Sequence, residues 1–298
     1  MHFFLLRSLI DSSMDIEALR TICGVTEQQA ERLAKCTGGV LEDSCFLHWC
    51  LTGKEPELYP AFYGQELRLS PGFHVEIGQP EPYQAVSPQE VTQWRDVPWS
   101  LIQSSSGSEP EQCVICMCAF EATEEGEVVC LGRCKAHYFH KACISQAFGS
   151  SSSVKCPVCG TCYGEQVGAM PAGVMGVTYE RALQCDGFNY GTWIIYYFFP
   201  DGLKDNMPYK GTTREAFVPN TVEGREVLRL LICAFYRRVS FAVGTSVTTG
   251  ASNTVVWSGI HHKTSPEGGP TNFGYPDEGY FARVKGELAA RGVVYNPV

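Results

Sequence analysis

Eight cysteine and histidine residues recur at regular spacing in the middle of the chain, and they constrain its fold more than any other feature. They form four pairs, with two residues between the members of each pair. Thiolate and imidazole groups are the ligands that zinc prefers, and eight of them complete two tetrahedral sites with no open position. We therefore expect two structural Zn2+ ions, which hold a shape and do not activate water. The eight residues are Cys113, Cys116, Cys134, His137, His140, Cys143, Cys156 and Cys159.

The composition of the chain argues against nucleic-acid binding, secretion and a membrane span. The 298 residues carry a net charge of −9, and an acidic chain repels phosphate backbones, which argues against a zinc-dependent nucleic-acid binder. The apolar start, residues 1–6, has no basic segment before it and is cut short by Arg7, so it does not resemble a secretory signal. No apolar run reaches the ~18 residues of a membrane span. We expect a protein of a reducing compartment, the cytosol or the nucleus.

The N-terminal part predicts a unit of three short helices over residues 14–53. Thr26 and Gln29 have the spacing of a capping box at the start of the second helix, and Gly38 and Gly39 end it. The unit resembles the ubiquitin-associated (UBA) fold, which implies weak ubiquitin binding; an unrelated helical cap is the alternative. The resemblance rests on Gly24, Val25, Thr26, Ala30, Leu33, Gly39 and Glu42, whereas Cys36, Cys45 and Cys50 are interpreted as small apolar packing residues.

The other segments complete the expected domain organisation. Residues 54–108 are rich in proline and aromatic residues and are expected to be irregular, with a flexible linker at Ser104–Ser108 and no assigned role. The zinc domain takes residues 109–163. Residues 164–298 predict a mixed α/β unit, with strands at 192–199, 241–243 and 254–257 and helices capped by Asn220 and Asp277. The expected fold class is therefore multidomain α+β: a helical N-terminal unit, a zinc-braced finger and a mixed α/β C-terminal domain.

The order of the eight ligands resembles the RING finger of the H2 subtype. The ligands of that family interleave, which implies that the first and third pairs share one zinc and the second and fourth pairs share the other. Replacement of Cys134 by Cys130 is an alternative, and Cys118 and Cys162 are expected to be unliganded. Carried over, the first ion is held by Cys113, Cys116, His140 and Cys143, and the second by Cys134, His137, Cys156 and Cys159.

The RING resemblance also implies partners. RING fingers recruit a ubiquitin-conjugating enzyme (E2) loaded with ubiquitin and hold its thioester in a reactive pose, which is catalysis by positioning. Ile115, inside the first cysteine pair, and Pro157, inside the last, are the residues expected to contact the E2; loop packing is the alternative for each. Many RING fingers carry a cationic residue directly after the last cysteine, whereas Gly160 and Thr161 follow it here.

Beyond the finger, an ordered series of short motifs resembles the Deltex C-terminal domain. The series includes Gly211–Arg214, Val243–Ser246, Ile260–Thr264 and Gly274–Asp277, and with the finger it covers about residues 111–293. The resemblance implies a RING-type E3 ubiquitin ligase whose C-terminal domain binds ADP-ribose or NAD. It also implies that ubiquitin is joined to a hydroxyl of ADP-ribose, either free or already attached to a protein or nucleic acid.

The same resemblance implies the residues of the ADP-ribose site. Glu287 is expected to activate the ribose hydroxyl, and His261 to lie against the ligand. Without the resemblance, Glu287 reads as half of an i,i+4 pair with Arg283, and the two histidines as structural or exposed residues. The other expected contacts are the hydrogen-bonding groups of Gly244, Thr245 and Ser246, the aromatic walls Trp257 and Tyr275, and the side chains of His262 and Phe273.

Some positions depart from the family pattern. Phe273 stands where some members have a second pocket histidine, and Val247 stands where some have a serine. The segment Pro200–Tyr209 is short. A non-catalytic reader of ADP-ribose or ubiquitin, with the zinc fold as a scaffold, is the alternative function, and the missing cationic residue after Cys159 favours it.

Overall fold

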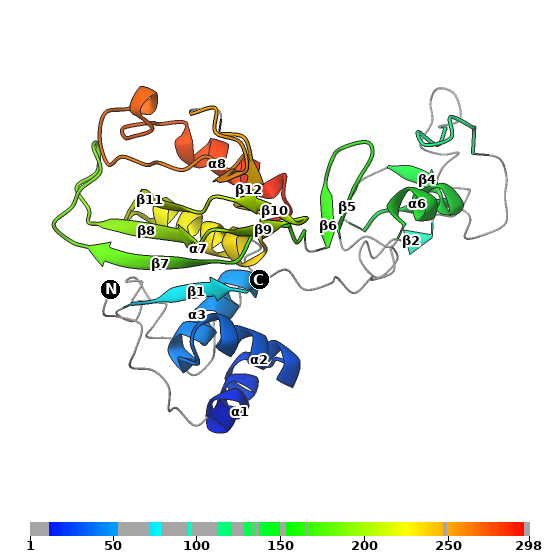
Figure 1. The fold of residues 1–298 in the computed structure, drawn as a ribbon. Helices are drawn as coiled ribbons and strands as arrows, with labels where there is room; N and C mark the ends of the chain where they lie inside the picture. Colours follow the sequence, from blue (N-terminus) through cyan, green and yellow to red (C-terminus); the bar gives the residue numbers. More distant parts are fainter. Residues whose placement is uncertain are drawn as a thin grey trace. The chain divides into compact units, whose positions relative to one another are not determined.

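The computed structural model describes residues 12–52, 72–78, 95–96, 112–120, 128–132, 134, 137–149, 153–164, 166–246 and 249–294 (Figure 1). Two compact units are present. The first consists chiefly of the described parts of Met1–Pro80 and Gly168–Leu288, and the second of the described parts of Glu81–Val167. None of the described helices is both long and apolar enough to cross a membrane. The expected linker at Ser104–Ser108 and Val247 lie outside the described residues.

A four-stranded antiparallel sheet forms the centre of the first unit. Its order is β1 (His74–Ile77), β7 (Gly173–Glu180), β8 (Thr192–Phe199) and β11 (Thr212–Pro219). The alternation along β8 assigns its faces: Ile195, Tyr197 and Phe199 are buried, whereas Tyr196 and Phe198 are exposed. Helix α7 (Val222–Tyr236) packs against the sheet (Figure 1). On the buried face, the ring centroids of Phe235 of α7 and Tyr197 of β8 lie 5.7 Å apart. The strand expected at 192–199 is confirmed.

Shorter elements complete this unit. Strands β9 (Gly202–Lys204) and β10 (Met207–Tyr209) form a hairpin, and β12 (Phe241–Gly244) pairs with β13 (Thr254–Trp257). The 3-10 helix η1 (Pro270–Asn272) and helix α8 (Tyr280–Ala289) follow. The pairing of β12 and β13 confirms the two expected strands and sets Phe241 against Trp257.

Both predicted N-caps in this unit are wrong, because the polar side chains have stronger partners. The N-cap of α7 is Thr221, whose hydroxyl accepts from the Gly224 N–H, while the Asn220 amide oxygen accepts from the indole of Trp193. Helix α8 begins at Tyr280, and the Asp277 carboxylate pairs with Lys263 and Arg283 instead of capping the helix.

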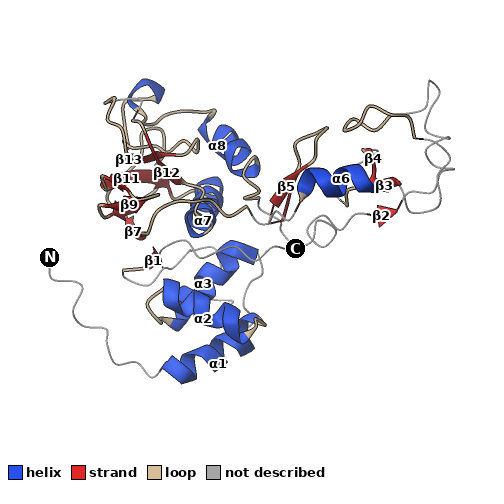
Figure 2. Cartoon of the chain, turned by 45° about the vertical axis from the view of Figure 1, so that its right-hand side comes forward, coloured by secondary structure: helices blue, strands red, loops and turns tan. Residues whose placement is uncertain are grey.

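The three helices expected at the N-terminus are present as α1 (Ser12–Cys23), α2 (Glu27–Cys36) and α3 (Leu41–Thr52) (Figure 2). The capping box of Thr26 and Gln29 is confirmed, with hydrogen bonds in both directions. Six consecutive α3 residues, 43–48, are buried, because this helix contacts α1 and α2 on one side and α7 on the other. A helix that is enclosed in this way behaves as part of a core and not as an amphipathic surface helix.

Aromatic residues of α3 join the helical unit to the rest of the first unit. Trp49 of α3 lies 4.3 Å from the guanidinium of Arg229, which projects from α7 and is 5% exposed. Phe46 packs edge-on against Phe73, the residue before β1. Strand β1 falls in the segment expected to be irregular, yet it extends the sheet. The structure therefore places the helical unit and the sheet in one compact unit, and the resemblance to the UBA fold stays a prediction.

The second unit contains the zinc-ligand region. Strands β2 (Arg95–Asp96), β3 (Val128–Cys130) and β4 (Tyr138–His140) form an antiparallel sheet, followed by α6 (Lys141–Phe148) and the hairpin of β5 (Ser153–Lys155) and β6 (Cys162–Gly164). Its apolar core is small and includes Phe120, Val129, Phe139, Ile144 and Tyr163. A core of this size gives limited stability by itself, so metal binding has to supply folding energy.

The contact between α3 and α7 is testable by substitution. Trp49→Ala removes an aromatic side chain and exposes a buried cation, so we expect the free energy of unfolding to fall by about 3 kcal/mol. Urea titration followed by circular dichroism measures this change. The control is Tyr190→Ala, since its ring is 57% exposed, and its effect is expected to stay below about 0.5 kcal/mol. Equal effects of the two substitutions would contradict the docked position of α3.

Candidate functional site

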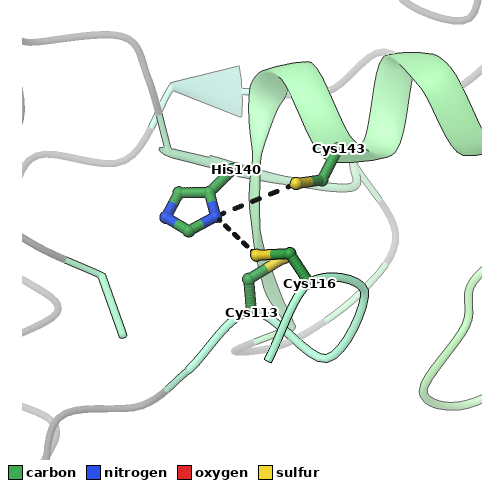
Figure 3. A group of neighbouring side chains, drawn as sticks. All are labelled: Cys113, Cys116, His140 and Cys143. Atoms are coloured by element: carbon green, nitrogen blue, oxygen red, sulfur yellow. Dashed lines mark hydrogen bonds between the residues drawn. The ribbon is translucent and has the colours of Figure 1, made fainter. Parts of the chain in front are cut away.

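Four ligands converge at each of two places in the second unit. The first group is Cys113, Cys116, His140 and Cys143 (Figure 3), the second is Cys134, His137, Cys156 and Cys159, and the ligand atoms within a group lie within 4.8 Å of one another. The Sγ atoms of Cys134 and Cys159 are 3.7 Å apart. A tetrahedral zinc with Zn–S bonds of ~2.3 Å requires S···S separations of about 3.8 Å. The residues therefore fit two structural zinc ions, and the interleaved pairing is confirmed.

The backbone prepares both sites with the same kind of turn. In the first, the Met117 N–H donates to the Cys113 carbonyl at 2.7 Å; in the second, the Gly160 N–H donates to the Cys156 carbonyl at 2.8 Å. Met117 and Gly160 occupy equivalent places, and both have a positive φ, 59° and 69°. The other ligands of the first site come from the start of α6, where His140 is the N-cap. Each site thus joins a tight turn to a different element of the fold.

Cys134, and not Cys130, is the ligand. The thiol of Cys130 donates to the Cys134 carbonyl at 3.5 Å and belongs to neither group. Behind the second site, the Tyr163 hydroxyl donates to the Cys134 sulfur at 2.9 Å, a contact that the ligand spacing did not predict. Burial raises the pKa of Cys134 to about 12, against the lowering effect of Tyr163, so metal binding has to displace a proton there. Tyr163 therefore helps to orient and stabilise this ligand.

The zinc loops also carry exposed apolar residues. Ile115 is half-buried and packs against the core of the unit, while Pro157 is exposed. Their neighbours Met117, Val114 and Val158 are 69%, 49% and 49% exposed. Apolar side chains that a fold holds open to solvent on rigid loops are typical of a protein-binding surface.

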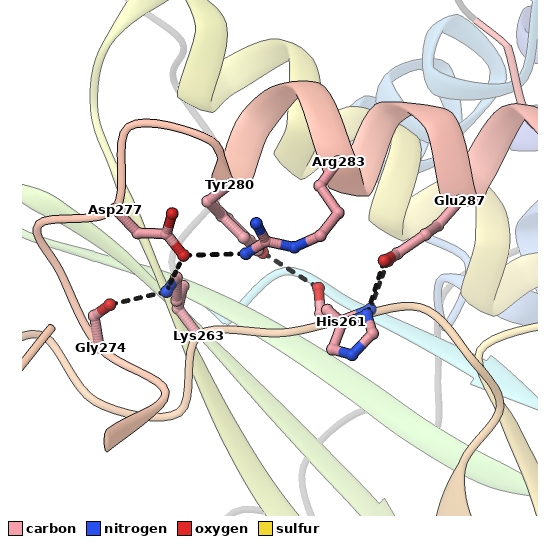
Figure 4. A network of polar contacts seen from close by, with 7 residues as sticks. All are labelled: His261, Lys263, Gly274, Asp277, Tyr280, Arg283 and Glu287. Atoms are coloured by element: carbon pink, nitrogen blue, oxygen red, sulfur yellow. Dashed lines mark hydrogen bonds and ion pairs between the residues drawn. The ribbon is translucent and has the colours of Figure 1, made fainter. Parts of the chain in front are cut away.

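A second constellation lies in the first unit, where α8 meets the segment 260–264. Glu287 binds His261 twice: one carboxylate oxygen accepts from the His261 N–H at 2.8 Å, and the other lies 2.6 Å from the ring Nδ1 (Figure 4). The Tyr280 hydroxyl donates to the His261 carbonyl at 3.2 Å. The imidazole is 63% exposed and the carboxylate 19%. The ring is therefore oriented by the protein while it faces solvent.

A buried cation sits beside this pair. The Lys263 ammonium donates to the Gly274 carbonyl and to Asp277, both at 2.7 Å, and Asp277 also pairs with Arg283 at 2.8 Å (Figure 4). The hydrogen bond from Lys263 lowers the pKa of the Asp277 carboxyl, so this carboxylate stays charged. Tyr280, Arg283 and Glu287 follow one face of α8. The network thus fixes this face of the helix against the segment that carries His261.

Two of the predicted ligand contacts are buried. His262 is 6% exposed and stacks on Trp257 with ring centroids 4.0 Å apart. Its Nδ1–H donates to the Ile260 carbonyl, and Nε2 accepts from the Tyr197 hydroxyl. Tyr275 is fully buried, and its hydroxyl donates to the Phe217 carbonyl. Tyr275 therefore has no surface open to solvent in this structure and its role as a wall stays a prediction, while His262 packs against Trp257.

The remaining predicted contacts lie nearer the surface. Gly244 and Ser246 are half-buried, and Thr245 is exposed. The loop after β12 holds itself together, since the Ser246 N–H donates to the Ala251 carbonyl and the Thr245 hydroxyl to Ser252. Phe273 is 62% exposed in a left-handed conformation, and its carbonyl accepts from the Thr264 N–H. The structure therefore links Phe273 to the histidine segment through the backbone.

Burial of His262 has a consequence for acid stability. Burial lowers the pKa of His262 from 6.5 to about 4. As the pH falls below about 6.5, the unfolded chain binds a proton at this position and the folded chain does not, so stability is lost down to about pH 4. We expect this residue to lower the free energy of unfolding by about 3 kcal/mol over that range.

Urea titrations at several pH values, compared between the wild type and His262→Gln, measure this contribution. The glutamine retains groups that bind Tyr197 and Ile260 but does not titrate. The slope of stability against pH between about 6.5 and 4 is expected to be smaller in the variant. Identical slopes would show that His262 is not the buried neutral group described here.

The fold and the two sites agree with comparisons to known proteins. A family model of the Ring finger domain matches residues 111–160, which contain both zinc-ligand groups, so the second unit is a RING finger. A model of the Deltex C-terminal domain matches residues 167–293, which contain His261 and Glu287. The chain therefore belongs to the Deltex family, in which a RING finger precedes a Deltex C-terminal domain.

Curated relatives that match this chain are named as E3 ubiquitin-protein ligases. The chain is 38% identical over 200 residues to "Probable E3 ubiquitin-protein ligase DTX3" of Homo sapiens, a match that covers 64% of this chain and 55% of the relative. It is 36% identical over 222 residues to "E3 ubiquitin-protein ligase DTX1" of Homo sapiens, covering 66% and 36%. It is 31% identical over 282 residues to "E3 ubiquitin-protein ligase DTX4" of Mus musculus, covering 86% and 44%. The chain spans about half the length of the first of these relatives.

Proposed function

We propose that the chain is a RING-type E3 ubiquitin ligase, which recruits a ubiquitin-loaded E2 through the two zinc loops. The observation that carries the proposal is the interleaved pair of zinc sites, which makes both loops rigid at once. Closed tetrahedral sites leave no position for substrate, so the metals supply shape and not chemistry. The relatives described above are named as ubiquitin ligases, which supports the same conclusion. Thiolate ligands require reducing conditions, so the proposed location remains the cytosol or the nucleus.

The zinc loops act by positioning. Ile115 is held between the core and the surface, and Met117 and Val158 are open beside the two metal turns. We expect the E2 to bind this apolar surface. Because the zinc ions already hold the loops rigid, little conformational entropy is lost when the complex forms. Transfer then depends on holding the thioester in reach of an attacking group and not on a nucleophile of the RING finger.

Substitution of Ile115 tests the ligase proposal. Ile115→Ala is expected to reduce ubiquitin-chain formation at least about tenfold in a reconstituted reaction, because it removes the apolar contact with the E2. Zinc content, measured by mass spectrometry, is expected to stay at two ions. Met207→Ala is the matched control, since Met207 is an exposed apolar residue of the first unit. Unchanged chain formation by Ile115→Ala would refute the proposed E2 contact.

We further propose that the Deltex C-terminal domain binds ADP-ribose or NAD beside His261 and joins ubiquitin to a hydroxyl of the ribose. The support is the double hydrogen bond between Glu287 and His261. Both carboxylate oxygens engage His261, so Glu287 orients the imidazole and stabilises its positive charge once it takes a proton. The ribose hydroxyl gives its proton to this pair as its oxygen attacks the thioester carbonyl, and the E2 thiolate leaves. ADP-ribosylated proteins or nucleic acids are then the proposed substrates.

Removal of the carboxylate separates the two activities. Glu287→Ala is expected to abolish transfer of ubiquitin to ADP-ribose while lysine ubiquitination continues, because only the ribose hydroxyl is proposed to give its proton to the pair of His261 and Glu287. His261→Ala is expected to lose the same activity if the pair acts together. Gel electrophoresis with labelled ubiquitin, with and without ADP-ribose, follows both products. Equal loss of lysine and ADP-ribose products in Glu287→Ala would contradict a role specific to the hydroxyl.

The alternative function is a non-catalytic reader of ADP-ribose or ubiquitin. Residues after the last zinc ligand favour it: Gly160 has no side chain, and Thr161 binds the sulfur of Cys159 at 3.0 Å, so neither offers a cation. The same reconstituted reaction decides between the two functions, because a reader binds ADP-ribose and forms no ubiquitin product.

A further inference from the structure

A pair of cysteines outside the zinc sites joins two helices of the N-terminal unit. Cys23 is the last residue of α1, and Cys45 lies in the middle of α3. Their sulfur atoms are 3.8 Å apart, within hydrogen-bonding distance for sulfur. Neither residue belongs to the groups with metal-ligand geometry among the described residues. The sequence around Cys45 is that of a packing residue, and its spacing from Cys23 does not identify the two as partners.

The two thiols differ in their access to solvent. Cys23 is half-buried at the end of its helix, where Gly24 turns the chain away with a φ of 64°. Cys45 is 1% exposed. A small reagent from solvent therefore reaches Cys23 more readily than Cys45.

The surroundings activate Cys23 in particular. A hydrogen bond with Cys45 and, to a smaller extent, the neighbouring His48 lower the pKa of Cys23 to about 5, against the raising effect of burial. His48 lies one turn beyond Cys45 on α3, is 7% exposed, and its Nδ1 has no hydrogen-bond partner among the described residues. Cys50, on the same helix, shows the opposite behaviour, because burial raises its pKa. A half-exposed thiolate beside a second thiol is the arrangement of cysteines that react with oxidants.

We propose that Cys23 and Cys45 form a peroxide-reactive pair, in which Cys23 is the nucleophile and Cys45 closes a reversible disulfide between α1 and α3. The Cys23 thiolate attacks one oxygen of hydrogen peroxide, an S–O bond forms, the O–O bond breaks, and hydroxide leaves and is protonated to water. The Cys45 sulfur then attacks the Cys23 sulfenic acid. The S–S bond forms as the S–O bond breaks, and the hydroxyl leaves as water with the Cys45 proton. Two thiols and one peroxide thus give one disulfide and two waters.

Oxidation of Cys23 and Cys45 is expected to have a different effect from oxidation of the zinc ligands. Oxidation of the RING cysteines destroys a metal site, whereas a bond between Cys23 and Cys45 joins two helices that already touch. The sulfur atoms have to approach from 3.8 Å to about 2.05 Å. We expect a rotation of the Cys23 side chain, at the end of its helix, to bring them together. A thiol reductant restores the pair, because the disulfide remains within reach of the solvent-facing Cys23.

Peptide mapping of the full, reduced and zinc-loaded chain tests the proposal. Hydrogen peroxide is added in steps, remaining thiols are alkylated, and trypsin is used because Arg32 and Lys35 place Cys23 and Cys45 on separate peptides. The expected product is a cross-linked peptide pair assigned to Cys23 and Cys45 by fragmentation, which disappears after reduction. It is expected before zinc is released, as followed by a chromogenic chelator.

Variants distinguish this order of events from a general oxidation of thiols. In Cys45→Ser, Cys23 is expected to stop at the sulfenic acid, which dimedone captures; in Cys23→Ser, Cys45 is expected to remain reduced. Cys36→Ser is the matched control, a half-buried cysteine of the same unit, and is expected to form the Cys23–Cys45 bond at the wild-type rate. His48→Gln is expected to slow the loss of the Cys23 thiol about tenfold. Circular dichroism checks that each variant is folded.

Two results would overturn the proposal. One is zinc release or oxidation of other cysteines at peroxide concentrations that leave Cys23 reduced in the wild type. The other is equal reaction of Cys45 in the wild type and in Cys23→Ser, which would show that Cys45 does not depend on Cys23.

Discussion

A buried charge determines the geometry around His261. The Lys263 ammonium is removed from water, and an unpaired ammonium in such a place costs far more than the fold can supply. Asp277 and the Gly274 carbonyl satisfy it, and Asp277 also holds Arg283 of α8. Because Lys263 is two residues from His261 and Arg283 is four from Glu287, this pairing sets the histidine and the glutamate opposite each other. Loss of the ion pair would leave the proposed catalytic pair without a common frame.

The zinc sites were the part of the molecule that a linear sequence describes best. Structural zinc sites use cysteine and histidine ligands, and short turns set the spacing of these residues, so the ligands can be recognised from the sequence alone. The strand at 192–199 was equally clear, since its β-branched and aromatic residues have few alternative structures. Tyr163 was not recognisable in the same way. Its hydroxyl reaches Cys134 from a strand far along the chain, and no local pattern records that contact.

Other features depend on competition between partners, which spacing alone does not resolve. Asn220 has the chemistry of an N-cap, but the Trp193 indole binds it and Thr221 caps α7 instead. Strand β1 stands among proline-rich residues and has little strand character of its own, yet β7 supplies its hydrogen bonds. The roles proposed for His261 and Glu287 came from the family resemblance, because an exposed histidine and a helical glutamate are common in any protein. The structure adds that the two are joined by two hydrogen bonds.

The pairing of β1 with β7 also says something about how the chain comes to be folded. Ile77 and Gly173 are neighbours in the sheet, and the whole RING finger lies between them in the sequence. During synthesis, β1 leaves the ribosome long before its partner strand exists, so the first unit stays incomplete while the RING finger is being made. An autonomous, metal-driven nucleus is well suited to such an insertion, because it can reach its native state without waiting for the sheet that surrounds it in the sequence.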